Sequence, residues 1–389
     1  MIPELDLPVL AEAEVAVAGA GPAGVAAALA AARSGARVVL LEQTGCCGGM
    51  ATSGLVPVFI HISDRVHRVA SGICYELVSE MCRRMEVPAV DEIWQHIHPE
   101  VLKRVCDDKL AEAGVELLLA VKVADVIRSG GRIDALAVAT SRGLKKVTAS
   151  IFVDATGDGL VAAAAGVPFE LGDEAGRTMS PSLCVQYSNI NLDRMREAER
   201  RGEGAGQLWF RYRDEIPLDE YHIVGVSEYG SGSGSGNLGH IYGVDATDER
   251  DVTRGYVEGR RVADDIGCFC YPVDIHASTP DAARQKRVAE RMRETAYLPG
   301  ENYGIPYRAL IPREVTNLLT AGRCISTDRE VQSSLRVMPA CMITGAAAGA
   351  AAALAAGTRD VRRGSIGLLR RQQRRVGAYH PETRPEPDT

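Results

Sequence analysis

Three glycines and one glutamate near the start of the chain have the types and the spacing needed to bind a dinucleotide. The pattern is Gly19-x-Gly21-x-x-Gly24, and Glu42 follows eighteen residues after the last glycine. In this pattern the first glycine allows a tight turn, the second lets a pyrophosphate approach the backbone, and the third lets a helix pack closely on a strand. A carboxylate at the position of Glu42 accepts hydrogen bonds from a ribose diol and repels a 2′-phosphate, which disfavours NADP.

The segments around these residues predict the elements that must position them. Residues 14–18 (EVAVA) alternate as a short buried strand does, residues 25–35 form an alanine-rich helix that ends at Gly35, and residues 36–42 form a second strand. The free amides and the positive end of such a helix hold an anion. This strand–turn–helix–strand context favours a nucleotide site over a merely structural glycine turn.

A second glycine pair helps to choose between the common dinucleotides. Gly48 and Gly49 lie just beyond the position expected to hold the ribose. NAD does not require the backbone to pass a second time over the pyrophosphate, whereas the longer, bent FAD does, so the pair favours FAD. Residues 234–239 (GSGNLG) fit the same glycine pattern, but they lie in a glycine–serine run with no strong helix after it. We predict a flexible loop there.

Composition limits the classes of protein that fit. The 389 residues suggest one large or two medium domains. A net charge of −7 argues against broad nucleic-acid affinity, because phosphate binding needs clustered cations. The first ten residues lack the basic segment of a signal peptide. The apolar run near the front is interrupted by Arg33 and Arg37, and the alanine-rich run over residues 343–356 is too short for a membrane span. We expect a soluble cytoplasmic protein that binds neither nucleic acid nor a membrane.

The cysteines and histidines do not predict a metal centre. The pairs Cys46-Cys47 and Cys268-x-Cys270 lack the spacing of structural zinc or iron–sulfur sites. Free buried thiols are the favoured interpretation of the ten cysteines. A Cys46–Cys47 dithiol that relays electrons is the disfavoured alternative, because vicinal cysteines rarely close an unstrained disulfide. His96-x-His98 is expected to precede a helix at Pro99 rather than to bind a metal.

The remaining pattern divides the chain into segments. Residues 98–113 predict a helix, residues 115–120 a buried strand, residues 121–150 a three-stranded meander, and residues 151–154 a further strand. After Val167 the hydrophobic pattern becomes less regular, with mixed strands and polar loops. An apolar strand within residues 317–326 and a small-residue helix over residues 339–357 then resume the nucleotide-binding pattern, and a basic amphipathic stretch over residues 362–380 reads as a solvated face.

Five motifs in a fixed order resemble a known family. They are GAGPAG (19–24) with Glu42, GGMATSGLV (48–56), DATGDG (154–159), NLLTAGRCIS (317–326) and SLRVMPACMITGAAAGAAAALA (334–355). Together they resemble FAD-dependent oxidoreductases with a glutathione-reductase-type Rossmann domain. The nearest group comprises the flavoproteins related to fumarate reductase, succinate dehydrogenase and the flavin subunit of heterodisulfide reductase.

The resemblance implies an α/β fold in which a discontinuous FAD-binding, Rossmann-like domain carries an inserted mixed α+β substrate domain. The first part of the FAD-binding domain would span residues 1–166 and the substrate domain residues 167–302. The second part, with the C-terminal helices, would span residues 303–375, and residues 376–389 would be a tail.

The resemblance also implies roles for individual residues around FAD. Gly19, Gly21 and Gly24 would hold the pyrophosphate, and Glu42 the adenosine ribose. The backbone of Val123 would meet the adenine edge. The N-terminus of the helix near 337–339 would face the flavin, where it stabilises the negative charge of the reduced ring by roughly 1 kcal/mol. The other expected contacts are Pro22, Ala23, Gln43, Gly48, Gly49, Met50, Ala51, Ala155, Thr156, Gly157, Asp158, Gly322, Arg323, Val337 and Met338.

Catalytic candidates are side chains that could face the flavin from the substrate domain or its flanking loops. His276 could act as an acid or base near neutral pH. Arg308 or Arg336 could clamp a substrate carboxylate or donate a proton, and Tyr307 lies beside Arg308 in the chain. His61 is a weaker candidate. Three of these residues also have a non-catalytic interpretation. His276 could hydrogen-bond a loop, Arg308 could pair with an acid such as Glu301, and Arg336 could contact the cofactor and not the substrate.

The expected function is hydride transfer between a small organic substrate and non-covalently bound FAD. Two alternatives are kept: a flavin-dependent isomerase or lyase without net redox change, and a flavoprotein subunit that passes electrons inside a larger complex. The electron donor or acceptor is not defined by the sequence, and a homo-oligomer is compatible with it. No second nucleotide fingerprint is visible, which disfavours direct reduction by a nicotinamide cofactor.

Overall fold

A mixed sheet at the centre of the molecule carries the nucleotide-binding pattern. The computed structural model describes residues 7–88, 93–172, 176–215, 226–230, 232–240, 263–276 and 282–381. The sheet has the strand order β5-β2-β1-β8-β7-β6, and β14 also pairs with β8. Its strands are β1 (Val9–Ala18), β2 (Val38–Glu42), β5 (Glu116–Leu119), β6 (Lys122–Ser129), β7 (Arg132–Thr140), β8 (Gly143–Asp154) and β14 (Leu318–Thr320).

The long strand β8 joins the two halves of this sheet. The sequence predicted a meander that ends at residue 150 and a separate strand over 151–154, and this division is wrong. β8 is one strand of twelve residues, antiparallel to β7 along its first half and parallel to β14 near its end. No glycine, proline or asparagine interrupts residues 144–153, so nothing in that stretch favours a turn.

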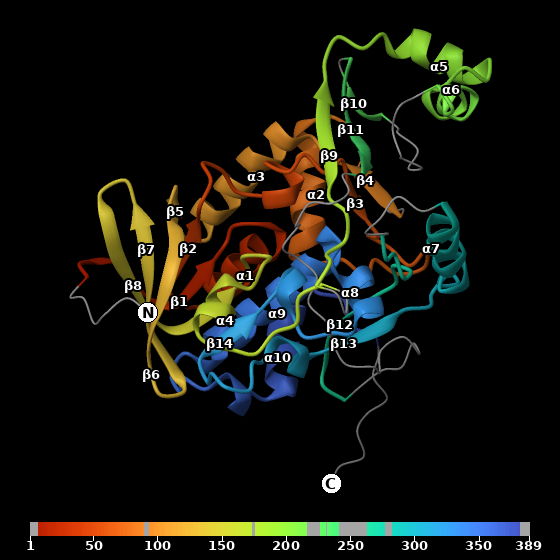
Figure 1. Cartoon of the computed structure of the whole chain (residues 1–389). Coiled ribbons are helices and arrows are strands. Elements are labelled where there is room, and N and C mark those ends of the chain that lie inside the picture. The colour runs from red at the N-terminus through yellow and green to blue at the C-terminus, as the bar shows by residue number, and fades with distance from the viewer. Residues whose placement is uncertain are drawn as a thin grey trace.

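Two helices of small residues cover one face of the sheet. α1 (Pro22–Arg33) and α9 (Met338–Ala355) lie against one another there, near the centre of Figure 1. A Cβ on Gly345 would lie 2.1 Å from the carbonyl oxygen of Ala23, and a Cβ on Gly349 would lie 2.0 Å from that of Ala27. Only glycine permits this approach, so the late helix depends on a partner more than three hundred residues earlier.

The opposite face of the sheet has its own core. Ala16 and Ala18 alternate with Val15 and Val17 along β1, and the two pairs belong to separate apolar clusters. The helix α4 (Leu160–Ala164) contributes Val161 and Ala162 to the second cluster. The central strands of the sheet, β1 and β2, are therefore buried on both faces where they pair, as expected of an α/β protein.

Asn317 connects the late strand to the early part of the sheet. Its side chain is fully buried; Oδ1 accepts from the amide of Ile133 at 2.9 Å, and Nδ2 donates to the carbonyl oxygen of Ile133 at 2.9 Å. Nδ2 also donates to the carbonyl oxygen of Ser150 at 3.2 Å. The two parts of the chain that carry the family motifs thus form one sheet.

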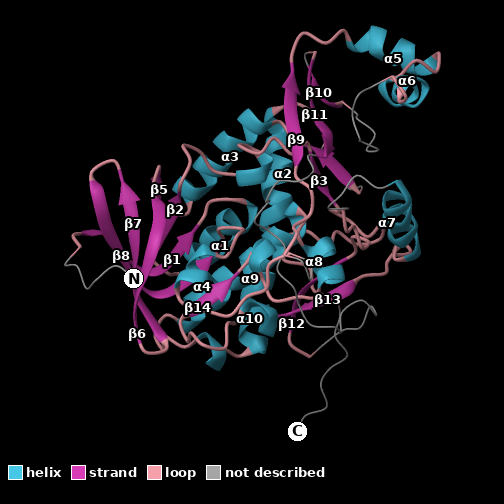
Figure 2. Ribbon diagram, in the orientation of Figure 1, coloured by secondary structure: helices cyan, strands magenta, loops and turns pink. Residues whose placement is uncertain are grey.

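Further elements surround this body (Figure 2). Between β2 and β5 lie β3 (Val58–Ile60), α2 (Ile73–Arg84), β4 (Trp94–His96) and α3 (Pro99–Glu112). A three-stranded sheet, α5 (Leu192–Arg200) and α6 (Ala205–Tyr212) extend away from the central sheet, at the upper right of Figure 1. The remaining elements are β9 (Ser182–Tyr187), β10 (Ser227–Gly230), β11 (Ser233–His240), β12 (Asp265–Phe269), α7 (Ala282–Glu294), β13 (Tyr303–Pro306), α8 (Arg329–Leu335) and α10 (Ile366–Arg375).

Two local predictions need correction. Residues 234–239 are not a flexible loop, because they belong to β11, which pairs antiparallel with β9 and β10. The small side chains fit a tight pairing there: a Cβ on Gly234 would lie 2.9 Å from the carbonyl oxygen of Ser227. The basic stretch at α10 is not only a solvated face, since Arg370 pairs with Asp265 at 2.6 Å and Gln373 donates to the carbonyl oxygen of Ile266 at 2.7 Å. Residues 382–389 of the predicted tail lie outside the described residues.

In the part of the chain that the structure describes, one helix is long and apolar enough to span a membrane, namely α9. Most of that helix is buried against α1 and the sheet. Its composition is therefore accounted for by packing in the protein core.

Candidate functional site

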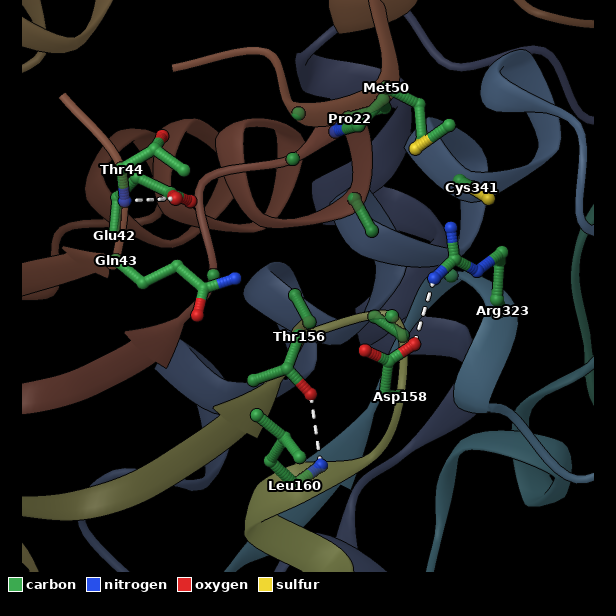
Figure 3. A pocket seen from close by; sticks show the side chains of 18 of the residues that line it. Pro22, Glu42, Gln43, Thr44, Met50, Thr156, Asp158, Leu160, Arg323 and Cys341 are labelled. Atoms are coloured by element: carbon green, nitrogen blue, oxygen red, sulfur yellow. Dashed lines mark hydrogen bonds and ion pairs between the residues drawn. The ribbon is translucent and has the colours of Figure 1, made fainter. Parts of the chain in front are cut away.

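A cavity of about 440 Å³ opens where four parallel strands end. The turns after β1, β2, β8 and β14 all reach it, because the carboxyl ends of parallel strands lie at the same edge of a sheet. Figure 3 shows their side chains converging on this space. Open α/β sheets bind ligands at this edge.

Most of the predicted cofactor residues line this one cavity. The members are Gly19, Gly21, Pro22, Ala23, Glu42, Gln43, Gly49, Met50, Val123, Ala155, Thr156, Gly157, Asp158, Gly322, Arg323 and Met338. Gly24, Gly48, Ala51 and Val337 do not line it. Sequence reasoning missed Leu41, Thr44, Ser53, Gly54, Val121, Lys122, Leu160, Ala321 and Cys341, which line it as well.

The first glycine turn has the geometry that its pattern predicts. Gly19 has φ of +91°, and a Cβ there would lie 2.6 Å from the carbonyl oxygen of Ala155. A Cβ on Gly24 would lie 1.7 Å from the carbonyl oxygen of Gly19. Gly21, by contrast, has only one atom within 4 Å of an added Cβ, the Cα of Gly49 at 4.0 Å. Gly19 and Gly24 are therefore needed for close packing, while Gly21 leaves its backbone open to the cavity.

The second glycine pair contacts the first. The amide of Gly48 donates to the carbonyl oxygen of Ala20 at 2.8 Å. Gly49 has φ of +50°, and a Cβ on it would lie 2.8 Å from the Cα of Gly21. The two glycine loops thus lie side by side at the cavity. The backbone therefore passes this part of the cavity twice, which is the arrangement expected for FAD and not needed for NAD.

The carboxylate of Glu42 sits at one end of the cavity and is held by two backbone amides. Oε2 accepts from the amide of Ala20 at 2.7 Å, and Oε1 accepts from that of Thr44 at 2.8 Å. A carboxylate has about four lone-pair positions, so two remain for a ligand diol. Val121, Lys122 and Val123 line the same cavity. This end suits an adenosine group.

A buried carboxylate that the sequence analysis overlooked organises the DATGDG loop. Asp154 is fully buried, and its Oδ1 accepts from the Oγ1 of Thr156 at 2.7 Å and from the amide of Thr156 at 3.1 Å. Its Oδ2 accepts from the amide of Ala162 at 2.9 Å. Beyond that loop, Asp158 and Arg323 form an ion pair of 3.0 Å across the cavity, seen in Figure 3.

Two helices begin at the cavity without an acidic or capping side chain. The N-cap of α1 is Gly21 and that of α9 is Val337; neither makes a side-chain cap, and neither first turn contains an acid. By contrast, the preceding helix α8 is capped by Asp328, which accepts from the amide of Val331. An uncapped helix N-terminus presents free amides and a positive partial charge to an anion. The cavity therefore meets the requirements of a pyrophosphate near α1 and of a ring that becomes negative near α9.

The end of the cavity at Arg336, Met338 and Cys341 adjoins a polar cluster. Asp274 accepts through Oδ2 from the hydroxyl of Tyr271 at 2.9 Å, from Nε2 of His276 at 3.2 Å and from Nη2 of Arg336 at 3.4 Å. Burial by itself raises the pKa of Asp274, but the hydrogen bonds and the nearby positive charges together hold it below its usual value. Asp274 therefore carries a negative charge, and it connects His276 to the cavity through Arg336.

Asp274 was not among the predicted site residues. It lies in the segment YPVDIH (271–276), of which only the histidine was singled out. The signal that could have found it was an acid two positions before a histidine, which is weak by itself. His276 does not line the cavity, and Arg336 is the one catalytic candidate that does.

The structure does not bring Tyr307 or Arg308 to the cavity. The hydroxyl of Tyr307 donates to the carbonyl oxygen of Val361 at 2.9 Å within the core. Arg308 is exposed and pairs with Asp264, not with the expected Glu301. These residues belong to a short turn of 3₁₀ helix, Tyr307–Leu310, which does not line the cavity. Neither is retained as a catalytic candidate.

The other candidates from the sequence also find structural partners. His61 lies 3.7 Å from the sulfur of Cys270, and burial lowers its pKa to about 4. Cys46 and Cys47 are free thiols, and burial raises the pKa of Cys47. His98 is the N-cap of α3, which begins at Pro99 as predicted. Within the described ranges, no group of three or more histidine, cysteine or acidic side chains could hold a metal ion.

A curated reductase matches about half of this chain. The chain is 29% identical over 201 residues to digeranylgeranylglycerophospholipid reductase 2 of Methanopyrus kandleri, a match that covers 47% of this chain and 46% of that protein. The chain thus spans less than half the length of this curated relative.

Solved structures show likeness at low identity. A geranylgeranyl bacteriochlorophyll reductase-like protein from Thermoplasma acidophilum is 14% identical, with a TM-score of 0.49, over 94% of this chain and 83% of that one. A flavoprotein/dehydrogenase from Cytophaga hutchinsonii is 14% identical, with a TM-score of 0.47, over 88% and 78%.

The family assignment rests on a match over most of the chain. The family model described as FAD dependent oxidoreductase matches residues 14–261 and 239–364. This match confirms the predicted α/β flavoprotein fold and FAD as the cofactor. The chain belongs to the FAD-dependent oxidoreductase family.

Proposed function

We propose that this FAD-dependent oxidoreductase transfers a hydride between a small organic substrate and FAD that is held without a covalent bond. The observation that carries the proposal is the single cavity that joins Glu42 at one end to Arg336 at the other, past two uncapped helix N-termini. Bound FAD supplies the hydride chemistry itself. The protein supplies position, charge and exclusion of water.

Different residues around the cavity would hold different parts of the cofactor. Glu42 and the backbone at Val123 would hold the adenosine part, and the amides at the start of α1 would hold the pyrophosphate. Arg323, fixed by Asp158, would lie beside the ribityl chain. We name the end lined by Arg336, Met338 and Cys341 the flavin end, because α9 begins there and its amides would stabilise a reduced ring.

The substrate would meet the chain at the flavin end. The guanidinium of Arg336 is suited to a carboxylate or another polar group of the substrate, since a guanidinium offers several fixed donors. His276, linked to Arg336 through Asp274, is the candidate for holding or moving a proton.

The name of the curated relative describes reduction of a prenylated phospholipid. The chain spans less than half of that protein, so we propose only the broader class of small organic substrate. We also propose a cytoplasmic location, which fits a chain whose ten cysteines form no disulfide.

The test is an anaerobic substrate panel read at the flavin absorbance. The purified protein is expected to be yellow and to release intact FAD on denaturation. Bleaching by one substrate, with stoichiometric product, supports the proposal. Turnover without bleaching would instead indicate a non-redox isomerase or lyase, and bleaching only after addition of a partner protein would indicate an electron-transfer subunit. A colourless protein that refuses added FAD would contradict the assignment of the cavity.

Replacing Glu42 with glutamine is expected to weaken FAD binding by at least tenfold. The amide group of glutamine places a donor against one of the two backbone amides that Glu42 now accepts from, and it removes the charge that favours a ribose diol. FAD titration of the cofactor-free protein by fluorescence measures the change. The control is Glu14→Gln, because Glu14 lies within β1 and accepts from the amide of Arg37, just before β2, and neither residue lines the cavity. Equal effects of the two substitutions would count against the assignment of Glu42.

A further inference from the structure

We propose that Asp274 is a positioning residue that fixes the guanidinium of Arg336 at the flavin end and offsets its charge, and so lowers the reduction potential of bound FAD. The inference rests on the proposed function, since it takes the flavin to lie at that end. It concerns a residue outside the five motifs, on a segment that does not itself line the cavity.

Two contacts join the partners. Nη2 of Arg336 donates to the backbone carbonyl oxygen of Asp274 at 3.1 Å and to its Oδ2 at 3.4 Å. Both side chains are largely shielded from solvent, with 13% of Asp274 and 28% of Arg336 exposed. Screening by water is therefore weak, and the charge of each partner acts on its surroundings.

The segment that carries Asp274 is attached to the helix that leads to Arg336. The amide of Asp274 donates to the hydroxyl of Ser333 at 2.9 Å. The hydroxyl of Ser334 donates to the carbonyl oxygen of Tyr271 at 2.6 Å. Both serines lie in α8, which ends one residue before Arg336. The carboxylate and the guanidinium are thus held on one rigid unit, which is what a positioning role requires.

The balance of charge gives the direction of the effect. Among the described residues, Asp274 is the one acid that forms an ion pair with Arg336. Tyr271 and His276 also donate to Asp274 and share its negative charge. Without the carboxylate, the guanidinium would present an uncompensated positive charge to the flavin. Reduction adds negative charge to the ring, so a positive neighbour favours the reduced form and raises the potential.

The experiment compares reduction potentials of the FAD-loaded protein by spectroelectrochemistry at pH 8. Asp274→Asn keeps the shape and removes the charge, and it is expected to shift the equilibrium toward reduced flavin at least tenfold, about 30 mV for a two-electron couple. Arg336→Met is expected to shift it at least as far in the opposite direction. The double variant is expected to lie between the two single variants, near the original protein.

The matched control is Asp264→Asn. Asp264 also pairs with an arginine, but Arg308 is exposed and lies outside this cavity, so no change of potential is expected. Unfolding of the FAD-free variants by heat measures structural damage separately.

Unchanged potentials in both single variants, with FAD bound, would overturn the role of Asp274 and leave the proposed function standing. If Asp274→Asn does not retain FAD, Arg336→Met decides: a potential lowered by at least about 30 mV supports the inference, and an unchanged potential overturns it. Failure of the original protein to bind FAD would instead refute the proposed function.

Discussion

Replacing Gly24 with alanine is expected to lower the affinity for FAD by at least a hundredfold, about 2.8 kcal/mol. The added Cβ would lie 1.7 Å from the carbonyl oxygen of Gly19 and 2.8 Å from its carbonyl carbon. Both atoms belong to the backbone of the turn proposed to hold the pyrophosphate, so no side chain can move aside. α1 must shift or the turn must open, and either change displaces the amides at the helix N-terminus.

The helix propensity of alanine predicts the opposite effect, a more stable helix, so the test can separate propensity from the close contact. Alanine is favoured over glycine within a helix by about 1 kcal/mol, so propensity alone predicts a more stable protein. Titration of the cofactor-free variant with FAD and its thermal unfolding measure both quantities. The control is Gly45→Ala, since an added Cβ on Gly45 has nothing within 4 Å. Normal FAD binding by the Gly24 variant would show that the turn does not need this close contact.

Replacing Gly349 with alanine is expected to lower the free energy of unfolding by about 3 kcal/mol. Its Cβ would lie 2.0 Å from the carbonyl oxygen of Ala27, in the middle of the contact between α1 and α9. Inserting one methyl group into a packed core typically costs 1–3 kcal/mol. Here the obstacle is backbone on a helix that is itself buried, so we expect the upper end of that range.

Chemical denaturation measures this change, and Gly357 provides the comparison. Gly357 follows the end of α9, and a Cβ there would meet nothing within 4 Å. Gly357→Ala is expected to alter the free energy of unfolding by less than 1 kcal/mol. A Gly349→Ala protein as stable as the original would show that α1 and α9 are farther apart than the structure places them.

The sequence predicted the nucleotide-binding unit well because its signals are local. Residues 14–42 contain a strand, a turn and a helix in contiguous order, and each is specified by neighbouring residues. The fold class followed from that unit and from the order of the five motifs. The resemblance to FAD-dependent oxidoreductases implied most of the residues that line the cavity, and the fold brings them together because the ends of parallel strands meet at one edge of a sheet.

The tertiary structure decided what depends on contacts between distant segments. The small residues of α9 could be read as a helix, but only α1 explains Gly345 and Gly349. Tertiary structure also separated the catalytic candidates, because Arg308 is exposed to solvent and Arg336 lines the cavity.

Asp274 shows the physical reason for this limit. Its importance comes from Arg336, sixty-two positions later in the chain, and no pattern of turns or periodicity links the two. The sequence by itself predicted that a dinucleotide is bound and which glycine loops would hold it, since backbone conformation there is fixed by local residue types. Which side chains face the flavin end was decided by packing, because it depends on how β12, α8 and α9 meet in space.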